Sequence, residues 1–184
     1  MRKKRKPRFL PFLLVGLILA VPFALRQFFP KGYEGYVDKY SKECGLDKHF
    51  VLAVIKTESD FDPKAVSDVG ARGLMQLMSD AFDWVAFRKD DDRYTYEDMY
   101  DPEVNIEYGT YLLKLLYEEY GDERTALAAY HTGRGRVNSW LTDERYSEDG
   151  KTLTYIPSSA TAHYVDKVMG AYFVYRFIYE GQVD

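Results

Sequence analysis

The chain has 184 residues, of which 46% are hydrophobic and 29% charged, a composition typical of one globular domain and unlike a disordered or fibrous protein. Its single cysteine, Cys44, excludes an internal disulfide and any cysteine-cluster metal site. Residues 1–26 hold seven Lys or Arg and no acid, which leaves 18 basic against 29 acidic residues in the remainder, and so acidic a body excludes nucleic acid as the expected partner.

The N-terminal segment has the pattern of membrane targeting. Six of the first eight residues are Lys or Arg, and an uncharged, apolar run follows from Phe9 to Leu25. As a helix this run extends roughly 25 Å, slightly less than the roughly 30 Å hydrocarbon core of a bilayer. A cleaved signal peptide is the alternative, but Pro22 stands two positions before Ala24 and leaves no good small-x-small cleavage site.

We therefore predict a single-pass membrane protein with its N-terminus in the cytoplasm. The positive-inside rule places the basic head at 1–8 on the cytoplasmic side. A transmembrane signal anchor follows at 9–26 and a linker at 27–32. Residues 33–184 form the extracytoplasmic domain, which carries the function.

From residue 33 onward, apolar residues recur three and four positions apart without convincing strand alternation, so this domain is predicted to be all-α. Helices are expected at 33–43, 47–59, 79–87, 101–121, 122–130 and 161–180, and a polar surface loop at 88–100. The signals for their N-termini are Asp47, Ser79, Asp101 with Pro102, and Asp122. The signals for their ends are Gly45, Gly121, Gly133 and Gly135.

Glu58 lies near the end of the second expected helix and shares a face with Val51, Val54 and Ile55. A carboxylate against an apolar face loses solvation, which raises its pKa and lets it stay protonated near neutral pH, as a general acid must. The alternative is a glutamate at a helix end that turns toward water.

Further motifs follow Glu58 in a fixed order. Glu58-Ser59-Asp60-Phe61 is followed by Gly73-Leu74-Met75-Gln76, then by Ala129-Tyr130-His131-Thr132-Gly133, and then by Ile156-Pro157, Thr161 and Tyr164-Val165. Together with Asn105 and Gly109 on the helix between the second and third motifs, this set resembles the soluble lytic transglycosylase family over about residues 36–175. The resemblance implies a lysozyme-like catalytic domain that cleaves bacterial peptidoglycan, here in a membrane-anchored form.

The resemblance implies that one carboxyl group performs both steps of the reaction. Glu58 would protonate the glycosidic oxygen between N-acetylmuramic acid and N-acetylglucosamine, and would then remove the proton from the muramyl C6 hydroxyl to form a 1,6-anhydro end. A conventional glycosidase needs two carboxyl groups. Asp60, Asp62 and Asp68 are close enough in sequence to supply a second one, although roles in turns and caps are expected for them. A hydrolytic muramidase and a non-catalytic peptidoglycan-binding scaffold of an envelope assembly remain as alternatives.

The resemblance also implies the residues that contact the glycan. Ser59 and Gln76 would make polar contacts near the cleaved bond, and Met75 would line the sugar groove. Tyr130 and Tyr164 would flank Glu58. The Tyr164 hydroxyl is expected to hydrogen-bond the catalytic carboxylate and hold its orientation, whereas plain core packing is the alternative for both tyrosines.

Two positions depart from the family pattern. His131 stands where the family usually has Asn, and Ala160 where it usually has Glu. His131 either donates to a sugar oxygen, with a pH dependence that Asn would lack, or replaces the amide as a neutral group.

No metal ion or cofactor is expected. His49 and His163 are isolated and lack the spacing of paired metal ligands. Residues 133–136 (GRGR) suggest a phosphate site, but a helix end followed by a loop is the better interpretation. Trp84 and Trp140 are interpreted as core residues rather than as platforms for sugars.

Overall fold

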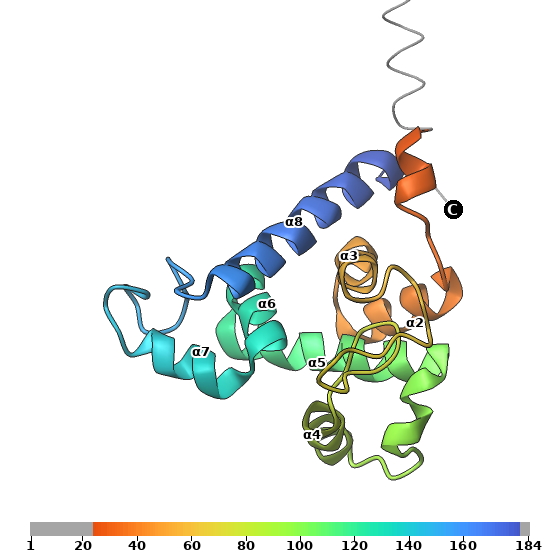
Figure 1. The fold of residues 1–184 in the computed structure, drawn as a ribbon, viewed down its shortest axis with the longest axis horizontal. Helices are drawn as coiled ribbons and strands as arrows, with labels where there is room; N and C mark the ends of the chain where they lie inside the picture. The colour runs from red at the N-terminus through yellow and green to blue at the C-terminus, as the bar shows by residue number, and fades with distance from the viewer. Residues whose placement is uncertain (1–23, 181–184) are drawn as a thin grey trace, which may run out of the picture.

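Helices account for the regular structure of residues 24–180, the part of the chain that the computed structural model describes (Figure 1). In chain order they are α2 (Glu34–Cys44), α3 (Lys48–Glu58), α4 (Ser79–Lys89), the 3-10 helix η1 (Tyr96–Tyr100), α5 (Pro102–Tyr120), α6 (Glu123–Thr132), α7 (Arg134–Leu141) and α8 (Ser159–Tyr179). Extended pairing in this part of the chain is limited to isolated bridges of Val66 and Leu77 with Arg72. The prediction of an all-α domain is confirmed.

Aspartates begin three of the helices as predicted. The Asp47 side chain accepts from the His49 amide at the start of α3, and Asp122 accepts from the Thr125 amide at the start of α6. Asp101 accepts from two amides of α5, whose first residue is Pro102. These carboxylates satisfy backbone N–H groups that have no partner within their helix. The capping residues in the sequence were therefore sufficient to predict where these three helices begin.

The predictions for Ser79 and Gly135 are wrong. Ser79 is the first residue of α4, and no side chain caps this helix. Gly133 alone, at φ 86°, redirects the chain between α6 and α7, and Gly135 lies inside α7. Because the buried Val137 anchors α7 to the core, the helix forms despite its polar, glycine-containing sequence. Residues 133–136 are consequently the junction at Gly133 and the first turn of α7, where a helix end followed by a loop was expected.

The predicted surface loop at 88–100 is only partly irregular. Its last residues form η1, which Thr95 and Asp98 begin with a reciprocal capping box. The Met99 side chain of η1 is fully buried, so this polar segment contributes one anchor to the core. A single apolar residue among polar neighbours gives no periodic signal, which is why the sequence pattern missed it.

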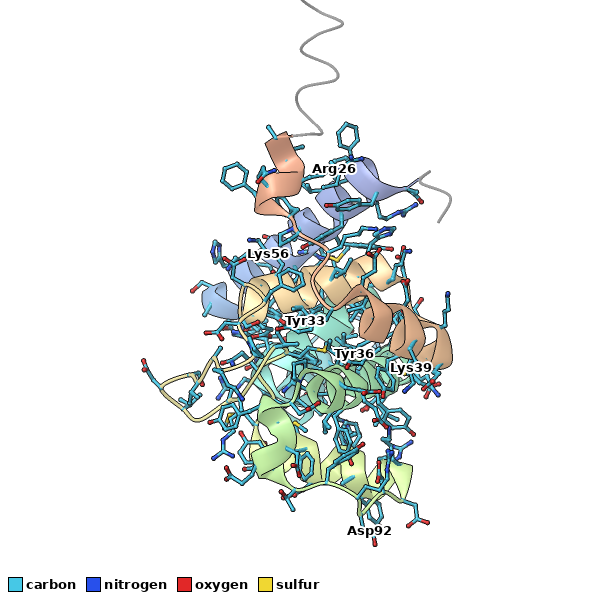
Figure 2. All side chains as sticks on the ribbon, turned by 90° about the vertical axis from the view of Figure 1, so that its right-hand side faces the viewer. Arg26, Tyr33, Tyr36, Lys39, Lys56 and Asp92 are labelled. Atoms are coloured by element: carbon cyan, nitrogen blue, oxygen red, sulfur yellow. The ribbon has the colours of Figure 1, made fainter. Side chains whose placement is uncertain are left out.

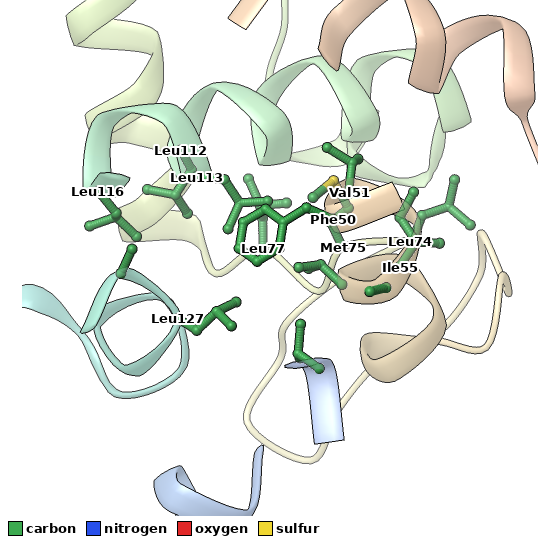
Figure 3. Close-up of a cluster of buried hydrophobic side chains, with 14 of the residues drawn as sticks. Phe50, Val51, Ile55, Leu74, Met75, Leu77, Leu112, Leu113, Leu116 and Leu127 are labelled. Atoms are coloured by element: carbon green, nitrogen blue, oxygen red, sulfur yellow. The ribbon is translucent and has the colours of Figure 1, made fainter. Parts of the chain in front are cut away.

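Helix α5 lies at the centre of the domain and contacts α2, α4, η1 and α6. Helix α8 packs along α3 and α6, and Figure 1 shows it crossing one side of the molecule above them. The core gathers leucines of α5 and α6 with apolar residues of α3 and of the 74–77 segment (Figure 3). This arrangement brings the end of α3, the segment 73–76 and the start of α8 together.

The predicted membrane anchor falls mostly outside the described residues. The basic head at 1–8 and positions 9–23 of the anchor are not part of them. Among residues 24–180, no helix is both long and apolar enough to cross a bilayer. The linker predicted at 27–32 is held against α8 at two carbonyls. The Tyr175 hydroxyl donates to the Pro30 carbonyl and the Tyr179 hydroxyl to that of Phe29.

Candidate active site

Glu58 is the last residue of α3, and its carboxyl group meets α8. The Tyr164 hydroxyl donates to Glu58 Oε1 over 2.6 Å. Val51, Val54 and Ile55, on the same face of α3, are fully buried, and the Tyr164 ring is 8% exposed. The hydrogen bond expected between Tyr164 and Glu58 is therefore present, and the carboxyl group turns inward rather than toward bulk water.

Burial raises the pKa of the Glu58 carboxyl from 4.5 to about 7. The hydrogen bond from Tyr164 and the positive charge of Lys167 both favour the ionised form, but they offset only part of the lost solvation. Close to neutral pH the group is therefore divided between its acid and base forms. A carboxyl group in this state can both give and take a proton.

A groove passes Glu58 and consists of two adjoining pockets that share Gln76. The first has a volume of about 960 Å³, and its wall includes Glu58, Ser59, Lys56 and residues of α8. The second has a volume of about 430 Å³ and is lined by residues of α4, α5 and α6. Gln76 is the residue that the walls of both pockets have in common.

Hydrogen bonds hold the backbone of the groove segment 73–76 in place. The Ser59 hydroxyl donates to the Leu74 carbonyl over 2.8 Å, and the Tyr130 hydroxyl donates to the Met75 carbonyl over 2.6 Å. Asn105 accepts from the Met75 amide over 2.8 Å. Helices α3, α6 and α5 thus each fix one point of this segment, which carries Gln76 into the groove.

Met75 does not line the groove, contrary to the expectation from the resemblance. Its side chain is fully buried in the core cluster of Figure 3. A Cβ atom on Gly109 of α5 would come within 2.4 Å of the Met75 sulfur, so the glycine leaves the space that this side chain occupies. Met75 therefore contributes to the site through its backbone.

Gln76 presents its amide to the groove in a constrained geometry. Its backbone has a positive φ of 47°, and its side-chain nitrogen donates to the carbonyls of Ala65 and Gly73. These two bonds use both amide hydrogens, so the amide oxygen is the group left to accept from a ligand.

His131 and Tyr130 lie on the wall of the second pocket. The His131 ring stacks on Tyr164 with 4.5 Å between centroids, and the residue is exposed. Partial burial lowers the pKa of His131, which favours the neutral imidazole. Ala160, the second departure from the family pattern, is exposed at the start of α8.

The pattern of the sequence did not identify Trp84 as part of the groove. Trp84 packs partly against the core, as expected, but it also lines the second pocket. The Arg134 guanidinium lies 4.5 Å from the centre of its ring and is held there by two hydrogen bonds to Glu119. Nothing in the local sequence of α4 distinguishes a tryptophan at a groove from one in the core.

The nearby aspartates differ in their surroundings. Asp60 lines the first pocket with Glu58, but its side chain is largely exposed and pairs with Lys56. Asp62 accepts from the Lys64 amide in a turn, as expected, and Asp68 is exposed. Among residues 24–180 no three His, Cys, Asp or Glu side chains are grouped in a way that suits a metal ion.

Asn105 offers a direct test of how the groove segment is held. Replacing Asn105 by Ala leaves the Met75 amide and the Met99 carbonyl without the Asn105 side chain, whereas the Arg72 carbonyl keeps its bond from the Leu77 amide. We expect the free energy of unfolding, measured with urea, to fall by at least about 2 kcal/mol, because each of these two unpaired groups costs about 1 to 3 kcal/mol. The control is Asn138→Ala, which loses one hydrogen bond, from the Tyr120 hydroxyl to an exposed side chain, and should cost about 1 kcal/mol or less. Equal losses in the two variants would contradict this role of Asn105.

Comparison with known proteins finds that this chain is similar to transglycosylases. The transglycosylase SLT domain family matches residues 35–153. The soluble lytic murein transglycosylase of Salmonella typhimurium is 34% identical over 161 residues, which are 86% of this chain and 25% of that protein. The membrane-bound lytic murein transglycosylase C of Serratia proteamaculans is 31% identical over 166 residues, 78% of this chain and 46% of that protein.

Among solved structures, the 70 kDa soluble lytic transglycosylase of Escherichia coli matches with a TM-score of 0.75 at 30% identity. The match covers 85% of this chain and 26% of that one. The chain thus spans about a quarter of the length of the soluble relatives and just under half of the Serratia protein. The family resemblance inferred from the motifs is confirmed, together with the fold that it implied.

Proposed function

Because the chain belongs to the transglycosylase SLT domain family, we propose that it is a peptidoglycan lytic transglycosylase whose acid and base is Glu58. It cleaves the β-1,4 bond between N-acetylmuramic acid and N-acetylglucosamine and leaves a 1,6-anhydro end. The observation that carries the proposal is the carboxyl group with a pKa of about 7, held by Tyr164 in a groove. No cofactor or metal ion takes part.

The reaction conserves the proton on Glu58. The protonated carboxyl gives its proton to the glycosidic oxygen as the bond from the muramyl C1 breaks. The muramyl O6 then bonds to C1, and its hydroxyl proton passes to the carboxylate, which returns the enzyme to its starting form. Since Tyr164 donates to Oε1, Oε2 is the oxygen left to exchange the proton.

The remaining groove residues bind and position the glycan. The Gln76 amide oxygen and the ring nitrogens of the exposed His131 are the polar groups available to sugars, and Trp84 offers an aromatic surface in the second pocket. Ser59 and Tyr130 act through the groove segment, because their hydroxyl groups donate to its backbone.

We further propose that the domain at 33–184 works outside the cytoplasmic membrane, tethered by residues 9–26. The basic head at 1–8 and the apolar run after it support this topology. The name of the Serratia relative, a membrane-bound transglycosylase, is consistent with it. The partners are then glycan strands of the wall and the lipid bilayer, and the acidic body leaves no role for nucleic acid.

One observation favours a hydrolytic muramidase as the second candidate. Asp60 lines the same pocket as Glu58, so a second carboxylate is available to activate water. This candidate and the first differ in the product rather than in the bond that is cut.

Mass spectrometry of the released muropeptides separates the two candidates. The full chain in detergent is incubated with purified peptidoglycan, and Asp60→Asn is the matched variant. We expect products about 18 Da lighter than hydrolytic ones, the mass of one water, from both proteins, because Glu58 alone carries the chemistry. Reducing-end products that disappear in Asp60→Asn would identify a muramidase instead.

A further inference from the structure

Exposed phenylalanines gather at one end of the domain. Phe173 and Phe177 stand one turn apart on α8 and are 72% and 61% exposed, and Phe28 is 68% exposed. Among residues 24–180 only one other phenylalanine, Phe87, exposes more than 60% of its surface, and it lies alone on α4. Single exposed rings are ordinary on protein surfaces, but three in one region call for an explanation. We refer to Phe28, Phe173 and Phe177 as the aromatic patch.

The two segments that carry the aromatic patch are fixed to each other. Arg26 donates to the Ile178 carbonyl over 3.2 Å, and the Phe29 ring packs edge-on against Tyr175 with 5.4 Å between centroids. Figure 1 shows residues 24–29 beside the last turns of α8, and Figure 2, which labels Arg26, shows them at the same extremity of the molecule. The patch is therefore part of a rigid end of the domain.

The sequence on the N-terminal side of this end is the apolar run from Phe9 to Leu25. The run ends three residues before Phe28. A membrane into which this run inserts would therefore lie within a few residues of the aromatic patch. The cations nearby either pair with acids or lie over rings: Lys31 with Glu34, Arg176 with Glu180, and Arg26 over Tyr179. Aromatic rings next to basic side chains at the end of an apolar segment are typical of the membrane–water interface.

We propose that the aromatic patch docks on the surface of a lipid bilayer. The rings of Phe28, Phe173 and Phe177 enter the boundary between headgroups and acyl chains. The segment 26–30, clamped to α8, then holds the domain in one orientation instead of letting it swing on a flexible tether.

Docking would set the height of the groove above the membrane. Tyr164, which contacts Glu58, precedes Phe177 by thirteen positions on the same helix, which corresponds to roughly 20 Å along α8. The first pocket also reaches this end, because its wall includes Phe29 as well as Glu58. Cleavage would therefore be restricted to glycan strands close to the bilayer. This restriction rests on the proposed function, whereas the docking itself does not.

Fluorescence quenching by brominated lipids tests the docking. The full chain is reconstituted in phosphatidylcholine–phosphatidylglycerol vesicles with bromine on the acyl chains, as Phe177→Trp and, for control, as Phe87→Trp. Both positions are exposed, but Phe87 is near the end of α4, five residues before Asp92. Figure 2 shows Asp92 at the end of the molecule opposite to Arg26. After subtraction of the wild-type emission from Trp84 and Trp140, we expect a blue-shifted, quenched signal from Phe177→Trp and neither effect from Phe87→Trp. Equal signals from the two variants would overturn the proposal.

A double variant, Phe173→Ser with Phe177→Ser, keeps this result separate from catalysis. In detergent it should degrade purified peptidoglycan at the wild-type rate, because neither ring lines the groove. A wild-type protein with no activity would refute the proposed function and leave the quenching result standing. A different pair of results would overturn docking on lipid: the wild type forms a dimer in detergent that the double variant does not form, and the Phe177→Trp signal is not quenched. The aromatic patch would then be assigned to contact with a second copy of the chain.

Discussion

Replacing Glu58 by Gln is expected to lower turnover on purified peptidoglycan by a factor of roughly 10² to 10⁴, the usual contribution of general acid–base catalysis. This corresponds to roughly 3 to 5 kcal/mol of activation free energy. The amide can still accept the hydrogen bond from Tyr164, but it has no proton to give to the glycosidic oxygen. Binding to the sacculus should persist, because the groove keeps its shape.

The activity assay compares rates of muropeptide release by the wild type, Glu58→Gln and two further variants. Glu118→Gln removes a carboxylate from an exposed site on α5 and should leave the rate unchanged. Tyr164→Phe removes the hydrogen bond that orients Glu58 and should slow turnover by about tenfold, or about 1.4 kcal/mol. Because this bond favours the ionised carboxyl group, its loss should also move the alkaline limb of the pH profile upward. Wild-type activity in Glu58→Gln would refute the assignment.

The same substitution is expected to stabilise the fold at alkaline pH. In the folded protein burial raises the pKa of Glu58 to about 7, whereas the ordinary value is 4.5. Above pH 7 the folded protein therefore holds an ionised carboxylate with poor solvation. At pH 8 the free energy of unfolding of Glu58→Gln should exceed that of the wild type by up to about 3 kcal/mol.

This gain depends on pH in a defined direction. A raised pKa means that the folded state binds the proton more tightly, so Glu58 lowers the stability of the wild type as the pH rises from 4.5 to about 7. Below pH 4.5 the carboxyl group is protonated in both states, and the pH-dependent part of the difference vanishes. Urea unfolding of both full-length proteins in detergent at pH 4, 6 and 8 measures the difference in their free energies of unfolding. A difference between the two proteins that does not change with pH would show that Glu58 is ordinarily solvated.

The two predictions for Glu58 share one physical cause, because the burial that lowers the stability of the fold also keeps the carboxyl group protonated near neutral pH. The position at the end of α3, with its neighbours buried and Tyr164 across from it, favours the neutral carboxyl group. That preference is a cost to folding at pH 8 and a requirement for a general acid near neutral pH.

Features that depend on neighbouring residues could be predicted from the amino-acid sequence alone. Helix starts at Asp47, Asp101 and Asp122 follow from side chains that reach amides two or three positions away. The apolar side of Glu58 follows from the period of α3, because residues three, four and seven positions apart share a face. The order of the motifs was sufficient to identify the family.

The direction in which the groove residues point depends on contacts between distant parts of the chain, which the sequence pattern does not reveal. Tyr164 meets Glu58 across 106 positions of sequence, and Trp84 meets Arg134 from another helix. Met75 turns into the core although its neighbour Gln76 faces the groove. A segment without helical period has no preferred side of its own, so its side chains are oriented by contacts with distant helices, here through the bonds from Ser59, Tyr130 and Asn105.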